Sequence, residues 1–484
     1  MNTPTDDTHV SAPPSGDTLP RSTDLSPTDS RLVAAGLAKA PAISGKDLNW
    51  ALVLCFLAWT FAVYDFVLFG NLLPEMAADL GWTSAQSTGL NTAVTAGTAL
   101  VAFGIGPIVD RFGRRKGIVL AVAGAAVASG LTVVAGLLAG LIGGIGVVLL
   151  VLVRSLAGLG YAEQAINATY LNELFAQTHT DAKRAKRRGF IYSLVQSGWP
   201  IGSVLAAVSV YLLFPVGGWE LPFLVAVFPA VFILIAAKKL KETPQFVLRR
   251  EADRLLKAGH TAEAHELARE AGIDLTEQSA PLAAAFKGAS LRPTLVISIA
   301  FMLSWFGVLC FVMLGTSYLT AADGKDVPFT NALAILIVSN GTAFLGYLFH
   351  GWLGDRIGRR NAIALGWLLS GLSFLGLVLA PQGSFGLTIA LYSSGLFFLI
   401  GPFAALLFFN GESFPAHTRA TGGSIINASG QLGALVAGIG VTAALASGTG
   451  WDASVLMWGC VPILLSGLVI LGARNVDPRA VRTD

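Results

Sequence analysis

Apolar stretches of about twenty residues recur along this chain from Leu48 onward. A helix of that length crosses the roughly 30 Å hydrocarbon core of a bilayer, and backbone polar groups inside a membrane must be paired, so the stretches are expected to be helices. Only 13% of the residues are charged, about half the usual share of a soluble domain. The sequence therefore predicts an all-α, multi-pass membrane protein and argues against a soluble enzyme or a nucleic-acid-binding protein. Twelve spans are expected, at residues 48–72, 86–109, 117–138, 142–170, 189–212, 220–237, 292–319, 329–351, 361–380, 384–409, 420–445 and 453–473.

The positive charges indicate the orientation of these spans. If the N-terminus is cytoplasmic, 30 of the 32 Lys and Arg lie in inner connections or tails, while Lys325 lies outside and Arg154 lies within a span. In membrane proteins, Lys and Arg accumulate in the cytoplasmic connections. One missed helix would move every later connection to the other side, so this asymmetry supports the span count as well. Both termini are therefore predicted to be cytoplasmic. Residues 1–47 are polar and lack an apolar signal core, which predicts a disordered cytoplasmic tail; residues 474–484 form a second tail.

The longest internal connection, 238–291, divides the spans into a bundle of six at 48–237 and a bundle of six at 292–473. Apolar residues recur in this connection at helical spacing among Arg, Lys and Glu, which predicts short amphipathic helices on the cytoplasmic surface. A passive linker is the alternative. Three Cys lie in apolar runs without the spacing of a disulfide framework or a metal site, and the six His are scattered, so no metal or cofactor is expected.

The two halves share a motif after their second span. The first copy reads Gly106-Pro-Ile-Val-Asp110-Arg111-Phe-Gly113-Arg114-Arg115, and the second reads Gly351-Trp-Leu-Gly-Asp355-Arg356-Ile-Gly358-Arg359-Arg360. An acid follows near the end of the fourth span of each half, Glu173 and Glu412. A repeat offset of 245 residues, about half the chain, is expected for a duplicated six-helix unit.

On these motifs the chain resembles the major facilitator superfamily from residue 48 to 473. The segment Arg154-Ser-Leu-Ala-Gly-Leu-Gly160 resembles an Arg-x-x-x-Gly-x-Gly element of the superfamily. Two others are similar to elements of sugar porters and metabolite–proton symporters: Glu242-Thr-Pro-Gln-Phe and Glu412-Ser-Phe-Pro. Tyr64-Asp65-Phe66 and Gly160-Tyr-Ala-Glu163 most resemble sialic-acid and aromatic-acid proton symporters. The segment Gly198-Trp199-Pro200-Ile-Gly202-Ser203 departs from the Gly-Pro-x-x-Gly-Gly element of drug–proton antiporters, which weakens an efflux function.

The repeated motif also predicts a gate at the cytoplasmic ends of the helices. In each half the Asp can cap a helix and hold the following Arg, while the Glu approaches from the fourth span and clamps the inner ends together. The alternative is that these charges serve only to orient the chain. The predicted gating residues are Asp110, Arg111, Arg114 and Glu173, and in the second half Asp355, Arg356, Arg359 and Glu412.

Three ionisable residues lie within spans: Asp65, Arg154 and Glu163. Each costs about 2.5–3.5 kcal/mol near the centre of a membrane helix, so each needs a partner or a task. At 1.5 Å per residue, Asp65 and Arg154 lie at similar depths, roughly 12–15 Å below the outer surface, and are predicted to pair. Protonation of Asp65 would free Arg154 for a substrate anion; a static ion pair is the alternative. Glu163 is nine residues after Arg154, on the opposite face of an ideal helix, and is a further candidate for proton coupling.

Polar and aromatic side chains at helical spacing predict a substrate site between the halves, although each alone could be a packing residue. The candidates, besides Arg154, are Tyr192, Gln196, Trp199, Trp305, Asn340, Asn427 and Gln431. Together these features predict a proton-coupled importer of a small monocarboxylate or of an aromatic or cyclic acid, acting as a monomer in the plasma membrane. A sugar or polyol symporter is the first alternative and drug efflux the second. A membrane-embedded enzyme would need a nucleophile–base or metal constellation, which the spans lack, and a transporter-like receptor would show no flux.

Overall fold

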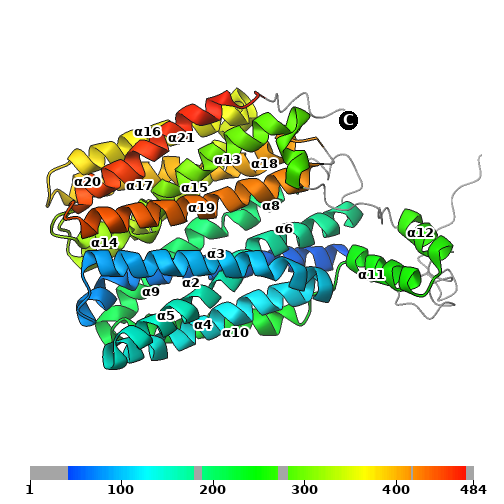
Figure 1. The fold of residues 1–484 in the computed structure, drawn as a ribbon, viewed down its shortest axis with the longest axis horizontal. Coiled ribbons are helices and arrows are strands. Elements are labelled where there is room, and N and C mark those ends of the chain that lie inside the picture. Colours follow the sequence, from blue (N-terminus) through cyan, green and yellow to red (C-terminus); the bar gives the residue numbers. More distant parts are fainter. Residues whose placement is uncertain (1–41, 179–187, 271–281, 416–417, 476–484) are drawn as a thin grey trace, which may run out of the picture. The chain divides into compact units, whose positions relative to one another are not determined.

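The computed structural model describes residues 42–178, 188–270, 282–415 and 418–475, and all regular secondary structure within them is helical (Figure 1). The chain divides into two compact units. Of the described residues, the larger unit, called the membrane unit below, holds those within 42–246 and 282–475, and the smaller holds residues 247–270.

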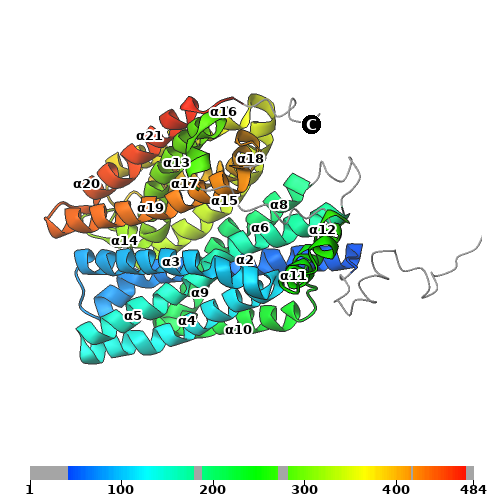
Figure 2. The same ribbon diagram turned by 45° about the vertical axis from the view of Figure 1, so that its right-hand side comes forward.

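The helices of the membrane unit form two sets that follow one another along the chain (Figures 1 and 2). The N-terminal half contains α2 (Gly45–Asp79), α3 (Ser84–Phe112), α4 (Arg114–Ile142), α5 (Gly144–Leu156), α6 (Gly158–Thr178), α8 (Arg188–Gln196), α9 (Gly198–Gly217) and α10 (Glu220–Ala237). The C-terminal half contains η1 (Leu282–Phe286), α13 (Gly288–Val308), η2 (Leu309–Met313), α14 (Gly315–Thr320), α15 (Phe329–Ile357), α16 (Arg359–Leu379), α17 (Phe385–Ile400), α18 (Phe403–Ser413), α19 (Arg419–Ala446), α20 (Trp451–Val455), η4 (Leu456–Cys460), α21 (Val461–Val469) and η5 (Ile470–Gly472).

Ten helical segments among the described residues are long and apolar enough to cross a membrane. The remaining two predicted spans correspond to α3 and to α5 with α6, between which lies Ala157. The count of twelve and the cytoplasmic position of the termini stay predictions. Several helices extend beyond their predicted ends: α2 has 35 residues and continues past Pro74 to Asp79.

Local sequence explains where the first helices begin. Ser44 and Asp47 form a capping box, in which the Ser44 hydroxyl accepts from the Asp47 amide and the Asp47 carboxylate accepts from the Ser44 amide. Thr83 and Gln86 do the same for α3. These caps satisfy amide donors that the first helical turn leaves without an intrahelical partner.

The repeated motif has the same backbone geometry in both halves. Gly113 precedes α4 with φ of 105°, and Gly358 precedes α16 with φ of 86°. Glycine adopts such angles without the steric cost that a Cβ atom imposes. The motif therefore reverses the chain sharply between the second and third spans of each half, which sends α4 back along α3 and α16 back along α15.

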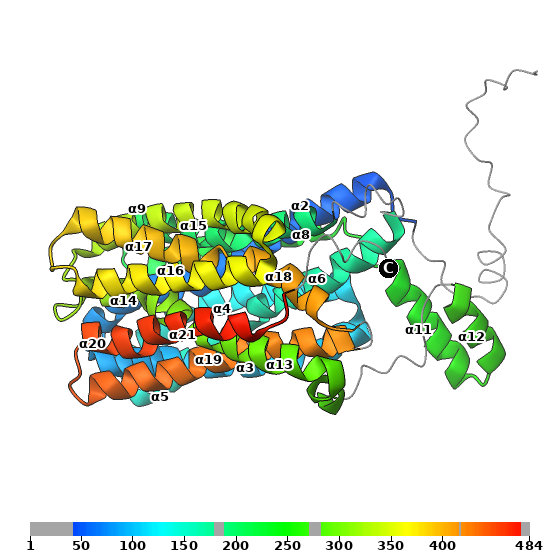
Figure 3. The same cartoon turned by 90° about the horizontal axis from the view of Figure 1, so that it is seen from above.

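Among the described residues, the halves meet mainly where α9 packs on α15 and α3 packs on α19 (Figures 2 and 3), and α2 also contacts α14 and η2. Close approach at Gly70 allows the contact of α2 with the C-terminal half, because a Cβ atom there would lie 2.3 Å from the carbonyl oxygen of Met313. Met313 belongs to the π-helical turn η2, which interrupts the seventh predicted span between α13 and α14.

The smaller unit contains most of α11 (Pro244–Lys257) and α12 (Thr261–Glu270), within the connection predicted to be amphipathic. Ala252 and Leu267 are buried against each other, with Leu248 and Leu255 packed around them. Glu251 has a fully buried side chain and accepts a hydrogen bond from Arg254 at 2.8 Å. These two helices form a small amphipathic hairpin with its own apolar contact.

Candidate functional site

A buried ion pair joins the first and fourth predicted spans. A guanidinium nitrogen of Arg154 on α5 donates to Oδ1 of Asp65 on α2 at 3.3 Å, and a second donates to the Asp65 backbone carbonyl at 3.1 Å. The Ser129 hydroxyl of α4 donates to the same carboxylate oxygen. Both side chains of the pair are 1% exposed. Since the two contacts come from different nitrogens, the guanidinium is held in one orientation relative to α2.

Two aromatic rings fix the Arg154 guanidinium further. Its central carbon lies 5.0 Å from the centre of the Phe69 ring and 5.5 Å from that of Phe223. Cation–π contacts of this kind stabilise a desolvated guanidinium while leaving its edge for hydrogen bonds. Within the described part of the chain, Arg154 Nε and Asp65 Oδ2 are buried without a hydrogen-bond partner. The pair thus keeps one unused donor and one unused acceptor.

A break in the fourth predicted span separates Arg154 from Glu163. The helix α5 ends at Leu156, and α6 begins at Gly158, where a Cβ atom would lie 2.6 Å from the carbonyl oxygen of Thr98. This tight approach to α3 requires glycine. Ala157 between the two helices keeps right-handed helical angles, with φ of −60° and ψ of −19°, and its amide donates to the Arg154 carbonyl at 3.1 Å, so the chain tightens locally three residues after Arg154.

Glu163 lies apart from the ion pair. It is completely buried on α6, close to Cys55 of α2 and Tyr192 of α8, and neither of its carboxyl oxygens has a hydrogen-bond partner among the described residues. The polar side chain next to it is Asn167, whose amide donates to the Cys55 carbonyl at 2.9 Å. The three predicted coupling residues therefore occupy two places: Asp65 with Arg154 in one, and Glu163 in the other.

Aromatic side chains from both halves meet next to the ion pair. Trp199 of α9 lies 6.3 Å from Trp305 of α13 between ring centres, 6.0 Å from Trp59, and 6.3 Å from Phe66. The ring of Trp305 lies 6.0 Å from that of Phe301. These five rings are called the Trp199–Trp305 row below. Offset and edge-on rings at these separations form surfaces against which a planar ligand can stack. Two predicted substrate residues, Trp199 and Trp305, are thus brought together across the halves.

The other predicted substrate residues make local contacts. The Gln196 amide donates to the Tyr192 hydroxyl at 3.0 Å, and the Asn340 amide donates to the Leu336 carbonyl of its own helix at 2.9 Å. On α19, Asn427 is exposed and Gln431 is buried. The role of these four residues in binding stays a prediction.

A small cavity adjoins Arg154. It encloses about 20 Å³ and is lined by Phe66 and Phe69 of α2, by Asn91 and Thr95 of α3, and by Met313 of the C-terminal half, among others. Sequence reasoning did not include Asn91 or Thr95. The signal was present, because Asn91, Thr95 and Thr98 recur at i, i+4 and i+7 and therefore share one face of a helix.

At the predicted cytoplasmic ends of the N-terminal half, Arg114 Nε donates to Glu173 at 3.2 Å, and the Thr243 hydroxyl donates to the other oxygen of the same carboxylate. The Glu242 carboxylate accepts from the backbone amides of Arg114 at 3.0 Å and Arg115 at 3.2 Å. The segment after the sixth predicted span therefore caps α4, whose own preceding residue supplies no side-chain cap.

The C-terminal half has the corresponding ion pair. Arg359 Nε lies 2.8 Å from the Glu412 carboxylate, and a second Arg359 nitrogen donates to Asp355 at 3.4 Å. Both this pair and the Arg114–Glu173 pair join helices of a single half. Arg111 and Arg356 are exposed and stack on neighbouring rings of their own helices, Phe112 and Trp352. The side chain of Asp110 lies outside what the structure describes.

Several contacts between the halves lie at the helix ends predicted to face outward. The Thr92 and Thr442 hydroxyls are 3.3 Å apart, and the Thr316 hydroxyl donates to the Asn71 side chain at 3.3 Å. The rings of Phe214 and Phe329 are 5.1 Å apart. These contacts bring α3 and α19, α2 and α14, and α9 and α15 together on that side.

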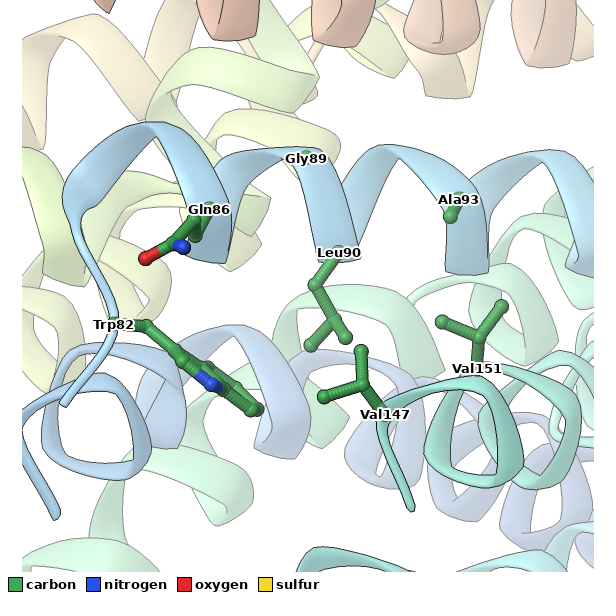
Figure 4. A pocket seen from close by; sticks show the side chains of 7 residues that line it. All are labelled: Trp82, Gln86, Gly89, Leu90, Ala93, Val147 and Val151. Carbon is green, nitrogen blue, oxygen red and sulfur yellow. The ribbon is translucent and has the colours of Figure 1, made fainter. Parts of the chain in front are cut away.

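A larger cavity of about 330 Å³ lies between the beginning of α3 and α5 (Figure 4). Figure 4 shows Leu90, Val147 and Val151 pointing toward it, with Trp82 and Gln86 at one end. Its lining contains no ionisable side chain, so it offers apolar packing and no charge-based recognition. Among the described residues, no group of three or more His, Cys, Asp or Glu is arranged to hold a metal ion.

Comparisons with known proteins agree with this arrangement. The family model described as the Major Facilitator Superfamily matches residues 54–437. The chain is 25% identical to the niacin transporter of Acinetobacter baylyi, and the match covers 86% of this chain and 91% of that protein. It is also 25% identical to the gallate transporter of Pseudomonas putida, and that match covers 89% of this chain and 92% of that protein. A solved D-xylose–proton symporter superposes with a TM-score of 0.65 at 16% identity, over 87% of this chain and 96% of that one, which shows a common fold.

Proposed function

This chain belongs to the major facilitator superfamily, and on that premise we propose that it imports a small organic acid together with a proton. It is a multi-pass protein of the plasma membrane, in a family of transporters and not of enzymes. The proposed substrate is a monocarboxylate, and within that class an aromatic or cyclic acid. The proposed working form is a monomer with twelve spans and both termini in the cytoplasm.

The observation that carries the proposal is the buried Asp65–Arg154 pair with its unused donor and acceptor. Proton transfer to Asp65 removes the negative charge that neutralises Arg154. A buried cation without a counterion is costly, so the protonated state favours binding of a carboxylate near Arg154. Release of the proton restores the internal pair and weakens the hold on the substrate. Proton and acid would therefore move together.

Two independent observations support an aromatic or cyclic acid as the substrate. The relatives that transport niacin and gallate carry ring carboxylic acids, as those names indicate. In this chain, Phe66 lines the cavity at Arg154 and is also part of the Trp199–Trp305 row. A charged anchor beside a set of ring faces matches the two ends of such a molecule.

Alternating access is proposed to follow from motion of the N-terminal half against the C-terminal half. The outer contacts, such as Thr92–Thr442, would separate to admit substrate. The pairs Arg114–Glu173 and Arg359–Glu412 would keep the inner helix ends of each half together as rigid bodies during that motion. The hairpin of α11 and α12 lies in the connection between the halves, and no role is assigned to it.

Uptake by purified protein in liposomes tests the proposal. The panel contains nicotinate, gallate, benzoate, a hexose and a betaine, each with and without an inward proton gradient. We expect gradient-driven accumulation of at least one ring acid by the wild type. Asp65→Asn is expected to lose accumulation while retaining exchange of the same acid across the membrane, because the amide cannot carry the proton.

Three other outcomes would overturn parts of this proposal. Accumulation of the hexose alone would make the chain a sugar symporter. Uptake that is the same with and without the proton gradient would show that the Asp65–Arg154 pair has only a structural role. Unchanged accumulation by Asp65→Asn would assign the proton to another group, with Glu163 as the next residue to replace.

A further inference from the structure

The cavity beside Arg154 contains a polar group that the proposed coupling mechanism does not use. Asn91 of α3 lines it, is 5% exposed, and its Nδ2 has no hydrogen-bond partner among the described residues. A buried amide donor left unpaired costs about 1–3 kcal/mol. An unpaired donor beside an arginine, inside a cavity, is the arrangement expected where a ligand completes the hydrogen bond.

The surrounding helix contacts hold Asn91 in position. The Thr95 hydroxyl donates to the Asn91 backbone carbonyl at 2.8 Å, one turn along α3. On the opposite wall, Gly70 allows the backbone of Met313 to approach α2 and cover the cavity from the C-terminal half. The amide therefore faces a space whose walls come from both halves of the transporter, as a substrate-sensing position requires.

The size of the cavity limits what can enter. About 20 Å³ is the space of roughly one water-sized group, so a carboxylate oxygen can enter and an aromatic ring cannot. Phe66 forms part of the cavity wall, and its ring lies 6.3 Å from that of Trp199. A ring acid with its carboxylate in the cavity would therefore place its ring toward Phe66 and the Trp199–Trp305 row.

We propose that Asn91 and Arg154 form a two-point site for the substrate carboxylate, in which the Asn91 amide donates to one oxygen and Arg154 to the other. This inference rests on the proposed function and assigns the part of the substrate that the transporter recognises. Asn91 supplies a neutral hydrogen-bond donor that is present whether or not Asp65 is protonated. Arg154 becomes available when Asp65 is protonated, so Asn91 contributes to recognition and Asp65 controls coupling.

The two-point site predicts discrimination between an acid and its uncharged amide. A hydrogen bond to a charged group contributes more than one to a neutral group, so loss of the Asn91 donor should penalise a carboxylate more than a carboxamide with the same ring. The effect should appear in the apparent affinity and not in the maximal rate, because Asn91 does not take part in proton transfer.

Asn91→Leu tests this, since leucine has nearly the same shape and no donor. For each ring acid that the wild type accumulates in liposomes, the KM is expected to rise about tenfold with the maximal rate within about twofold. Inhibition by the matching carboxamide, nicotinamide for nicotinate or benzamide for benzoate, should change less than inhibition by the acid. Asn91→Asp should raise the KM further, because a carboxylate at this position repels the substrate.

Asn71→Leu is the matched control. Asn71 is also a buried amide with an unpaired Nδ2, but it accepts from Thr316 at the outer contact and does not line the cavity. Thermal unfolding checks that the variants fold, and Asn91→Ala, which also lacks a donor, replaces Asn91→Leu if the latter does not.

The outcomes separate the two proposals. If the wild type accumulates ring acids and Asn91→Leu leaves the KM within about twofold, or weakens acid and carboxamide equally, the two-point site is wrong and the proposed function stands. If the wild type accumulates no acid, both fall.

Discussion

At the scale of single residues, the geometry around Arg154 requires a guanidinium and not only a positive charge. One planar group contacts both the carboxylate and the backbone carbonyl of Asp65 while its faces lie near Phe69 and Phe223. Lysine places one compact charge on a flexible stem and cannot make these contacts together.

Arg154→Lys is therefore expected to fold and yet to lose most gradient-driven uptake, by at least about tenfold, because each 1.4 kcal/mol of lost binding is a factor of ten. Liposome uptake measures the loss, and thermal unfolding verifies the fold. Arg249→Lys, at an exposed arginine outside the predicted site and gates, serves as the control and should retain uptake. Uptake by Arg154→Lys equal to that of the wild type would show that charge alone suffices.

At the scale of elements, the beginning of α4 depends on a distant segment. Gly113 provides the required backbone angle but no cap, and Glu242 accepts the hydrogen bonds from the first amides of the helix. A Cβ atom at Gly113 would lie only 2.3 Å from the Glu242 carboxylate, so the glycine is needed for the cap as well as for the turn. Sequence spacing indicated the motif but not this partner, which is more than a hundred residues away.

Glu242→Ala is expected to lower stability by about 1 kcal/mol, the usual effect of losing a helix cap. Burial raises the pKa of Glu242 above its ordinary value of 4.5, by more than the backbone amides lower it. The folded protein then holds this proton more tightly than the unfolded chain, so the contribution of Glu242 to stability declines as the pH rises above about 4.5. The Glu242→Gln variant keeps an acceptor oxygen at this position, but its side chain does not ionise.

Thermal unfolding in detergent, followed from about pH 4 to about pH 8, measures this effect. The stability of the wild type relative to Glu242→Gln should fall as the pH rises. Thr83→Ala removes a cap that does not titrate and should lower stability without adding a pH trend. A pH-independent difference between wild type and Glu242→Gln would contradict the assigned cause.

At the scale of the whole molecule, the outer contacts between the halves define the state that the structure represents. The Thr92 and Thr442 hydroxyls at 3.3 Å join α3 to α19, within a close approach that also includes Gly438. If transport requires these ends to separate, a covalent link between them should stop it. Disulfides form between side chains at such distances when the Cβ atoms are about 3.5–4.5 Å apart.

The double variant Thr92→Cys/Thr442→Cys is expected to lose uptake on mild oxidation and regain it with reductant. The native Cys55, Cys310 and Cys460 are all buried, so they should not compete for the link. Each single variant is the control and should be insensitive to oxidant. A fully crosslinked protein that still transports would show that the outer ends need not part.

The sequence alone determined the class of protein, because membrane burial imposes strong rules on composition. The apolar stretches, the placement of Lys and Arg, and the repeated Gly-x-x-x-Asp-Arg-x-Gly-Arg-Arg motif led to the superfamily that the family model confirms. The depths of Asp65 and Arg154 could be estimated from residue counts, since a helix advances by a fixed rise.

Only the tertiary structure decided which side chains share a space. Spacing could not show how closely Gly158, between Arg154 and Glu163, approaches the Thr98 carbonyl, because that distance depends on how α6 packs against α3. Nor could it bring Asn91 to the cavity beside Arg154, since that requires the packing of α2, α3 and η2 from two halves. Helical periodicity specifies the face on which a residue lies, whereas packing specifies what that face meets.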